Sequence, residues 1–300
     1  MTQEMLVEQI VAAILNSAQP VGADVNPPVS LQNPPESLYN PSMQLNNPPV
    51  QPNNPPVHPN NDISYSAGGK NATPTSSAES ISSARIAVGR AGTRLRTGTC
   101  LQFRADHAAA RDAVYNDVPA ELLQQLNLPE FATQCQSRDE FLTRPDLGKS
   151  FTEETAKAIR AYNPNPCDVL VYAADGLSSK SLAANLENIL PVILEGLSRQ
   201  GLKAGKPFFV KYGRVASMEP IAEYTGAKVV CVLLGERPGL GSAESMSAYM
   251  AYAPTVGMPE ARRTVVSNIY SGGLNAVEAG AYIAELLGKT FKAQKSGVEL

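Results

Sequence analysis

Apolar and polar residues alternate in two different periods along the second half of the chain. Four short apolar runs occupy residues 167–174, 206–212, 227–234 and 262–269. Segments with helical spacing of apolar residues follow at 181–200, 218–226, 242–252 and 275–293. Unbroken apolar strands that alternate with helices are typical of a parallel sheet covered on both faces. The pattern predicts an α/β fold in which residues 164–300 form a Rossmann-like parallel sheet domain.

Residues 84–163 contain shorter helical patterns and predict a small helical domain ahead of the sheet. Helices are expected within 101–118, 119–128 and 151–162, the last with Thr152 as N-cap and acidic residues in its first turn. The first of them places five residues on or near one face: Leu101, Phe103, His107, Ala110 and Val114. His107 on such a face is interpreted as a packing or interface histidine rather than a ligand or base.

The first 83 residues have a different pattern. Residues 1–20 predict a short amphipathic helix, which alone is marginal in water and therefore needs a surface to fold on. Of the 24 prolines, 12 precede residue 63, and an Asn-Pro motif recurs every seven residues over 26–60. Proline in every unit forbids a coiled coil and favours polyproline II, so 21–83 is expected to be a disordered Pro/Asn-rich linker. A helix on such a tether is better suited to a partner than to its own core.

Charge and cysteine usage narrow the class of protein. The net charge of −3 gives no reason to expect a nucleic acid or an anionic membrane as partner. Five arginines lie within twenty residues without interleaved stacking aromatics, so a loop facing a subunit or an amide-bearing ligand is preferred to an RNA site; they are Arg85, Arg90, Arg94, Arg96 and Arg104. The 4 cysteines are widely spaced and suggest reduced thiols in the cytosol, and no apolar segment is long enough for a membrane span.

Unusual loops follow all four predicted strands, and a ligand is expected at the carboxyl ends of those strands. The loops are Asp175-Gly176, Gly213-Arg214-Val215, Gly235-Glu236-Arg237-Pro238 and Ser271-Gly272-Gly273. The stretch Gly239-Leu-Gly241 lacks the third glycine of a dinucleotide fingerprint, and no P-loop is present. Isolated polar side chains and free backbone groups favour a large ligand edged with neutral amides over a pyrophosphate.

Six motifs together resemble the ethanolamine ammonia-lyase small (light) subunit family, over residues 84–300. They are RIAVGRAGTRLRTGTCLQFRADHAAARDAV, FLTRPDLGKSF, DGLSSKSLAANLENILP, GKPFFVKYGRV, LLGERPGLGSAES and RTVVSNIYSGG. The resemblance implies an adenosylcobalamin-dependent lyase that converts ethanolamine to acetaldehyde and ammonia by a radical mechanism. It also implies that a large partner subunit carries the substrate site while this chain holds one side of the cobalamin.

The resemblance carries cofactor-binding positions over to Val215, Glu236 and Val265. At Val265 a cysteine is familiar in the family, so a contact through sulfur would be lost while a backbone contact would survive. No catalytic residue and no protein ligand to a metal is assigned. The chain lacks the D-x-H-x-x-G motif that would offer a histidine to cobalt, because Asp106 and His107 are adjacent. Base-on cobalamin is therefore expected.

The resemblance also gives the amino-terminal helix a candidate partner, because such lyases are commonly housed in protein-shelled bacterial microcompartments in the cytoplasm. Residues 1–20 are then interpreted as a tag that binds shell proteins. Two alternatives stay open from the sequence. One is a freestanding nucleotide-dependent enzyme with a Rossmann-like sheet, and the other is a non-enzymatic scaffold that binds a shell through its tail.

Overall fold

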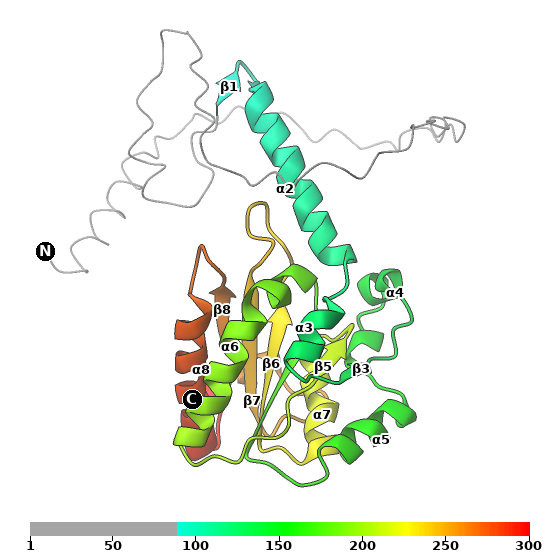
Figure 1. The fold of residues 1–300 in the computed structure, drawn as a ribbon, viewed down its shortest axis with the longest axis vertical. Coiled ribbons are helices and arrows are strands. Elements are labelled where there is room, and N and C mark those ends of the chain that lie inside the picture. The colour runs from blue at the N-terminus through cyan, green and yellow to red at the C-terminus, as the bar shows by residue number, and fades with distance from the viewer. Residues whose placement is uncertain (1–88) are drawn as a thin grey trace, which may run out of the picture. The chain divides into compact units, whose positions relative to one another are not determined.

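The computed structural model describes residues 89–300, which Figure 1 shows in colour. The predicted targeting helix at 1–20, the linker at 21–83 and Arg85 lie outside the described residues. The expectations for them therefore stay predictions.

A six-stranded sheet forms the centre of the described part, in the order β3-β5-β4-β6-β7-β8. The strands are β3 (Glu130–Ala132), β4 (Val169–Ala174), β5 (Phe209–Lys211), β6 (Val229–Gly235), β7 (Met246–Tyr252) and β8 (Thr264–Ile269). β3, β5, β4 and β6 pair in parallel, whereas β7 is antiparallel to both β6 and β8. The α/β class is confirmed, but the sheet is mixed rather than parallel.

The segment 242–252 was expected to be a helix, and this expectation is wrong. Its residues Met246–Tyr252 form β7, in which Met246, Ala248 and Met250 enter one core and Ala251 enters the core on the other face. Alanine and methionine favour a helix locally, but pairing on both sides with β6 and β8 outweighs that preference. The glycine-rich loop before β7 is consequently a connection between two antiparallel strands, not a strand-to-helix turn.

The predicted helices of the amino-terminal half are present: α2 (Thr97–Tyr115), α3 (Ala120–Gln125) and α5 (Glu153–Tyr162). Thr152 caps α5 as expected, because its hydroxyl accepts from the Thr155 N–H at 3.1 Å. Three features were not predicted from the sequence. They are a short hairpin of β1 (Arg90–Ala91) and β2 (Arg94–Leu95), the helix α4 (Arg138–Thr143), and the edge strand β3. β3 joins residues of the predicted helical domain to the central sheet, and the domain boundary near 163 itself stays a prediction.

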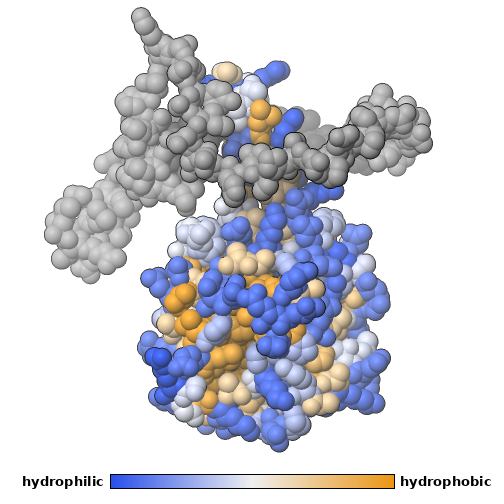
Figure 2. Space-filling view, in the orientation of Figure 1, coloured by the Kyte–Doolittle hydropathy of each residue, from blue (hydrophilic) through white to orange (hydrophobic). Residues whose placement is uncertain are grey.

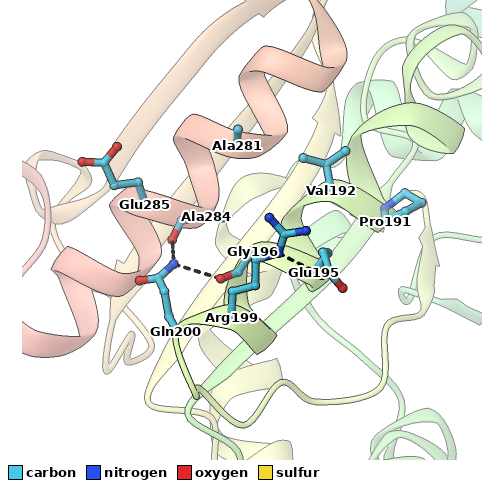
Figure 3. A pocket seen from close by; sticks show the side chains of 9 residues that line it. All are labelled: Pro191, Val192, Glu195, Gly196, Arg199, Gln200, Ala281, Ala284 and Glu285. Atoms are coloured by element: carbon cyan, nitrogen blue, oxygen red, sulfur yellow. Dashed lines mark hydrogen bonds and ion pairs between the residues drawn. The ribbon is translucent and has the colours of Figure 1, made fainter.

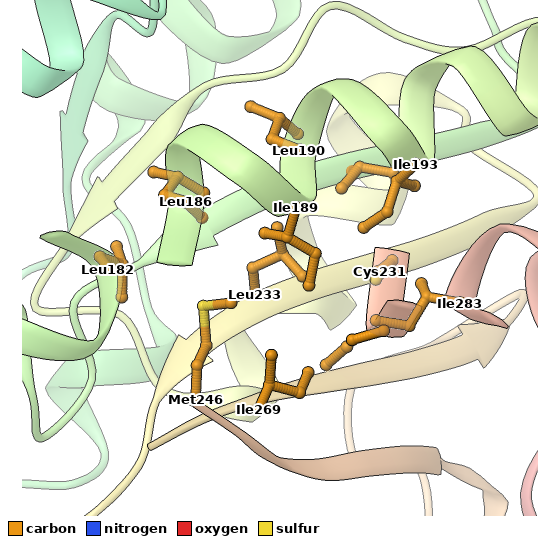
Figure 4. Packing of buried hydrophobic residues seen from close by; sticks show 14 of the residues in the cluster. Leu182, Leu186, Ile189, Leu190, Ile193, Cys231, Leu233, Met246, Ile269 and Ile283 are labelled. Carbon is orange, nitrogen blue, oxygen red and sulfur yellow. The ribbon is translucent and has the colours of Figure 1, made fainter. Parts of the chain in front are cut away.

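Helices cover both faces of the sheet. The long helices α6 (Ser179–Arg199) and α8 (Ala276–Ala293) pack on one face, while α5 and α7 (Met218–Thr225) pack on the other. Successive residues of β4 and β6 enter the two cores alternately, so these strands are apolar throughout. Figure 4 shows the first core, where Ile189, Leu233 and Ile283 meet. Short 3-10 turns occupy Leu147–Lys149, Val215–Ser217, Glu260–Arg262 and Gly297–Glu299.

The helix α2 contacts the body mainly through its carboxyl-terminal part. Ala110 and Ala113 are its buried residues, and the Ser179 hydroxyl donates to the Ala113 carbonyl at 3.2 Å. Leu101 is 59% exposed and His107 is exposed, so the face predicted to be apolar is not packed along its whole length against the part of the chain that the structure describes. Residues 89–300 contain no helix that is both long enough and apolar enough to cross a membrane.

Candidate functional site

A cavity of about 370 Å³ lies where β4, β5 and β6 end. It lies on the same side of the sheet as α5 and α7, because its lining residues Val215 and Tyr249 pack against the core that those helices cover. Three of the four glycine-containing loops contribute to it, together with residues from α4 and from the segment before β8. Its lining residues are Phe141, Pro145, Lys149, Gly176, Leu177, Gly213, Arg214, Val215, Ala216, Leu234, Gly235, Glu236, Tyr249, Glu260 and Arg263.

Two glycines at this edge are required by chain packing rather than by a ligand. A Cβ on Gly176 would lie 2.3 Å from the Gly235 carbonyl oxygen, and Gly176 also has a φ of +53°. A Cβ on Gly235 would lie 2.2 Å from the Ser178 carbonyl oxygen. The loop after β4 and the end of β6 therefore touch backbone to backbone, joined by a 2.9 Å bond from Leu177 N–H to the Gly235 carbonyl. Ligand contacts at the carboxyl ends of β4 and β6 are therefore expected from side chains rather than from these two glycines.

The fourth loop, Ser271-Gly272-Gly273, does not line this cavity. Ser271 lines another cavity, beside Asn185 of α6 and Asn275. The expectation that all four loops form one site is therefore wrong in this respect. β8 lies near the cavity through Val265, which pairs with the lining residue Tyr249, and not through the loop that follows the strand.

Two of the three predicted cofactor-binding residues, Val215 and Glu236, line the same cavity although 21 positions separate them in sequence. Val215 begins the 3-10 turn after β5, and Glu236 is the first residue after β6. Val265 is not among the lining residues, and it is 45% exposed on β8. It pairs with Tyr249, which does line the cavity, and paired residues project from the same face of a sheet. Val265 thus neighbours a lining residue of the cavity without lining the cavity itself.

Tyr249 connects the two sides of the site. Its phenolic hydroxyl donates to Glu236 Oε1 at 2.6 Å. Burial raises the pKa of the Tyr249 phenol, and the bond to Glu236 raises it further. Tyr249 is therefore a protonated donor at neutral pH, and the Glu236 carboxylate is the acceptor.

A buried ion pair supports the cavity from below. Arg138 Nη2 lies 2.8 Å from Asp175 Oδ2, and Arg138 Nη1 donates to the Gly176 carbonyl at 3.2 Å. The other Asp175 oxygen accepts the Gly213 N–H at 3.2 Å, so one carboxylate ties the loop after β4 to the loop after β5. Burial raises the pKa of Asp175 to about 6, although the Arg138 charge acts in the opposite direction. The guanidinium also stacks over Tyr212, 4.8 Å from its ring centroid.

The arginines of the cavity wall are engaged by the protein itself. Arg263 is 7% exposed and forms ion pairs with Glu219 of α7 and with Glu260. Arg214 donates to the Phe141 carbonyl at 2.6 Å and lies over the Phe141 ring at 4.5 Å. Arg263 is thus neutralised by two carboxylates, whereas Arg214 forms no ion pair within residues 89–300. The wall therefore carries both acidic and basic groups, and the sequence that forms it lacks a dinucleotide fingerprint.

Several residues that line the cavity or support its loops were not anticipated from the sequence. Tyr249 was not recognised because its segment was expected to be a helix. A helix at that position gives no reason to expect contacts with residues of neighbouring strands. Arg138 and Arg263 were missed because their partners are 37 and 44 positions away. Phe141, Pro145 and Lys149 fall in the motif FLTRPDLGKSF, which was noted only as part of the family resemblance. That motif was the one signal that could have directed attention to them.

A second large cavity, of about 660 Å³, lies between α6 and α8 (Figure 3). Small and apolar residues line it, among them Val192, Gly196 and Ala281, while Gln200 Nε2 donates to the Ala284 carbonyl at 2.8 Å. Figure 2 shows apolar residues gathered on this side of the molecule within a hydrophilic surround. The groove offers helix packing rather than converging polar groups. Within residues 89–300, no cluster of three or more His, Cys, Asp or Glu residues could hold a metal ion.

Fold and site define an α/β protein with an open polar cavity at the carboxyl end of its parallel strands. Residues 72–300 match the family described as Ethanolamine ammonia-lyase light chain (EutC). The chain is 56% identical over 217 residues to the ethanolamine ammonia-lyase small subunit of Clostridium tetani, which covers 72% of this chain and 74% of that protein. Small subunits from Listeria monocytogenes and Clostridioides difficile are 52% and 49% identical over the same length and the same shares of each chain. The chain therefore belongs to the ethanolamine ammonia-lyase light chain family.

Proposed function

We propose that this chain is the cofactor-holding small subunit of an adenosylcobalamin-dependent ethanolamine ammonia-lyase, an enzyme that converts ethanolamine to acetaldehyde and ammonia. The names of the relatives describe small subunits of that lyase, which supports a large catalytic subunit as partner. In this proposal the chain supplies no catalytic residue. It holds the cobalamin against the large subunit.

The observation that carries the proposal is the shared cavity wall of Val215 and Glu236, with Val265 beside the lining residue Tyr249. A corrinoid is much larger than about 370 Å³, so this chain alone would hold one edge of it and leave the rest to a partner. The neutral amides around a corrin ring can both donate and accept hydrogen bonds, which suits a wall that carries an acceptor such as Glu236 and a donor such as Arg214. A carboxylate such as Glu236 accepts amide N–H groups, and Val215 offers an apolar contact.

The residues of this chain would act by binding, orienting and excluding water. Adenosylcobalamin, when bound, supplies the radical chemistry of the reaction. Glu236 would fix one edge of the cofactor, and Val215 and Val265 would exclude water from its rim. The buried pair of Arg138 and Asp175 would keep the loops after β4 and β5 in place.

The nucleotide-dependent enzyme left open by the sequence is not favoured. Its phosphate-binding turn would have to lead from a strand into a helix, whereas Gly239 and Gly241 lie between antiparallel β6 and β7. The scaffold alternative is not favoured either, because it gives no reason for a polar cavity at the strand ends.

The test is reconstitution of the two-subunit enzyme. This chain and the large subunit of its ethanolamine ammonia-lyase are co-expressed, purified and mixed with adenosylcobalamin. We expect a red complex that retains cobalamin through gel filtration and releases acetaldehyde from ethanolamine, while either subunit alone shows no activity. A purified pair that stays colourless with cobalamin in excess would exclude the proposal, and quenching of NADH fluorescence would favour the nucleotide alternative.

We further propose that residues 1–20 direct the enzyme to the protein shell of a bacterial microcompartment in the cytoplasm. The support is the amphipathic pattern of that segment and the long Pro/Asn-rich tether behind it. The partners in this role are shell proteins rather than nucleic acid or a membrane.

A further inference from the structure

We propose that Tyr249 is a positioning residue that orients the Glu236 carboxylate for an amide of the cobalamin rim. This inference deepens the proposed function and rests on it. It assigns the specificity of the site to a pair of residues rather than to Glu236 alone.

The two partners differ in how firmly the fold holds them. Glu236 is the first residue of the loop between β6 and β7, and its side chain has several rotatable bonds. Tyr249 lies in the middle of β7 and is paired with Val232 of β6 on one side and with Val265 of β8 on the other. A residue fixed by strands on both sides is a better reference point than a loop residue. The hydrogen bond of 2.6 Å therefore restricts the rotamers of the Glu236 side chain, because its donor Tyr249 is fixed in the sheet.

The geometry leaves half of the carboxylate for a ligand. Tyr249 occupies Oε1, and among residues 89–300 no hydrogen bond or ion pair is formed by Oε2 of Glu236. The Glu236 side chain is only partly buried, and it lines the cavity together with Tyr249. An amide N–H of the corrin rim can thus bind Oε2 while the phenol holds Oε1.

Charged groups around Tyr249 are consistent with a donor role. Arg263 and Glu260 line the same cavity, but Arg263 is paired with Glu219 and Glu260 and so does not take the Glu236 carboxylate. The phenol is then the group that decides where Glu236 points. Losing the hydroxyl would leave the carboxylate free to adopt other rotamers, and binding would have to restrict them.

The experiment measures cobalamin affinity of the reconstituted two-subunit complex by its visible absorption. Four variants of this chain are compared with wild type: Tyr249→Phe, Glu236→Ala, the double variant, and Tyr252→Phe as matched control. Tyr252 lies on the same strand but packs toward the α6 and α8 core. We expect Tyr249→Phe to weaken binding roughly three- to ten-fold, the scale of one immobilised side chain. Tyr252→Phe should bind as wild type does, with melting temperatures of the complexes unchanged.

The double variant separates positioning from a general structural role. If Tyr249 acts through Glu236, Tyr249→Phe adds nothing once Glu236 is alanine. Full additivity of the two losses, or wild-type affinity of Tyr249→Phe, would overturn the inference while leaving the proposed function intact. Wild-type affinity of Glu236→Ala would overturn both the inference and the role that the proposed function gives to Glu236. Absence of cobalamin binding by the wild-type complex would instead overturn the proposed function.

Discussion

Arg138 and Asp175 form a buried ion pair beneath the candidate cobalamin site, with 2.8 Å between Nη2 and Oδ2. Arg138 comes from α4 and Asp175 follows β4, so the pair joins the amino-terminal helices to the edge of the sheet. Because Asp175 also accepts the Gly213 N–H, its position bears on two loops of the cavity.

Removal of the arginine charge is expected to destabilise the fold strongly. Arg138→Met leaves the Asp175 carboxylate, which is 1% exposed, without its cation, and the free energy of unfolding at pH 7 should fall by about 3–5 kcal/mol. Urea unfolding followed by circular dichroism measures this. The control is Arg144→Met, whose partner Asp146 is exposed, so that its loss should change the free energy of unfolding far less than the loss of Arg138 does. Equal effects of the two variants would contradict the assignment of a buried pair.

The same pair predicts a dependence of stability on pH. The pKa of Asp175 is about 6 in the folded chain, above its ordinary value of 3.8, because burial disfavours the charged form. The folded chain therefore binds this proton more tightly than the unfolded chain, and the contribution of Asp175 to stability falls as pH rises from about 4 to about 6.

Comparison with Asp175→Asn isolates this contribution, because the variant cannot titrate there. Between pH 4 and 7 the free energy of unfolding of the wild type relative to the variant should fall by on the order of 2 kcal/mol. Parallel pH profiles of the two proteins would show that Asp175 titrates at its ordinary value.

Substitution by alanine should have opposite effects at two helical glycines, one at the contact between α6 and α8 and the other in α2. A Cβ on Gly196 would lie 2.6 Å from the Ala284 Cβ, so Gly196→Ala should lower the free energy of unfolding by about 1–3 kcal/mol. No atom of residues 89–300 lies within 4 Å of a Cβ on Gly98 in α2, and Gly98→Ala should be neutral or stabilising by up to about 1 kcal/mol. Thermal denaturation of both variants tests the pair. Tolerance of Gly196→Ala would mean that the two helices pack less closely than the structure shows.

Histidine is not expected to bind the cobalt of the cofactor. His107 is exposed on α2 without the spacing of a cobalt-binding motif, and His58 lies outside the described residues. Labelling this chain with ¹⁵N-histidine should therefore leave the nitrogen hyperfine pattern of Co(II) in electron paramagnetic resonance unchanged. A changed pattern would mean that a histidine has replaced the dimethylbenzimidazole of the cofactor as lower ligand.

Deletion of residues 1–20 should separate packaging from activity. The truncated chain is expected to give wild-type turnover with the large subunit, because all residues of the candidate site follow residue 140. In cells that form shells, it should be found outside them by fractionation or fluorescence imaging. Lost turnover with normal packaging would assign the segment to subunit assembly.

Local pattern in the sequence was sufficient for much of the fold. The buried strands β4 and β6 are apolar at every position because both of their faces are covered, and that signal needs no partner to be recognised. The helices α6 and α8 show their periodicity in the same way, and the cap of α5 by Thr152 depends on residues three positions apart. Val215 and Glu236 line one cavity because parallel strands bring their carboxyl ends to the same edge of the sheet, and the strand–helix pattern already predicted parallel strands there.

Long-range contacts decided the rest. β7 has residues that suit a helix, and it is a strand because β6 and β8 pair with both of its edges. Two residue pairs of the site depend on such contacts: Arg138 with Asp175, and Tyr249 with Val265. The partners in each pair are far apart in sequence, and no local pattern predicts that they meet. The sequence by itself therefore determined the buried strands β4 and β6, the long helices α6 and α8 and the family of this chain. The tertiary structure alone decided the direction of β7 and the hydrogen bond that holds Glu236, because pairing energies between distant segments outweigh the small intrinsic preferences of each one.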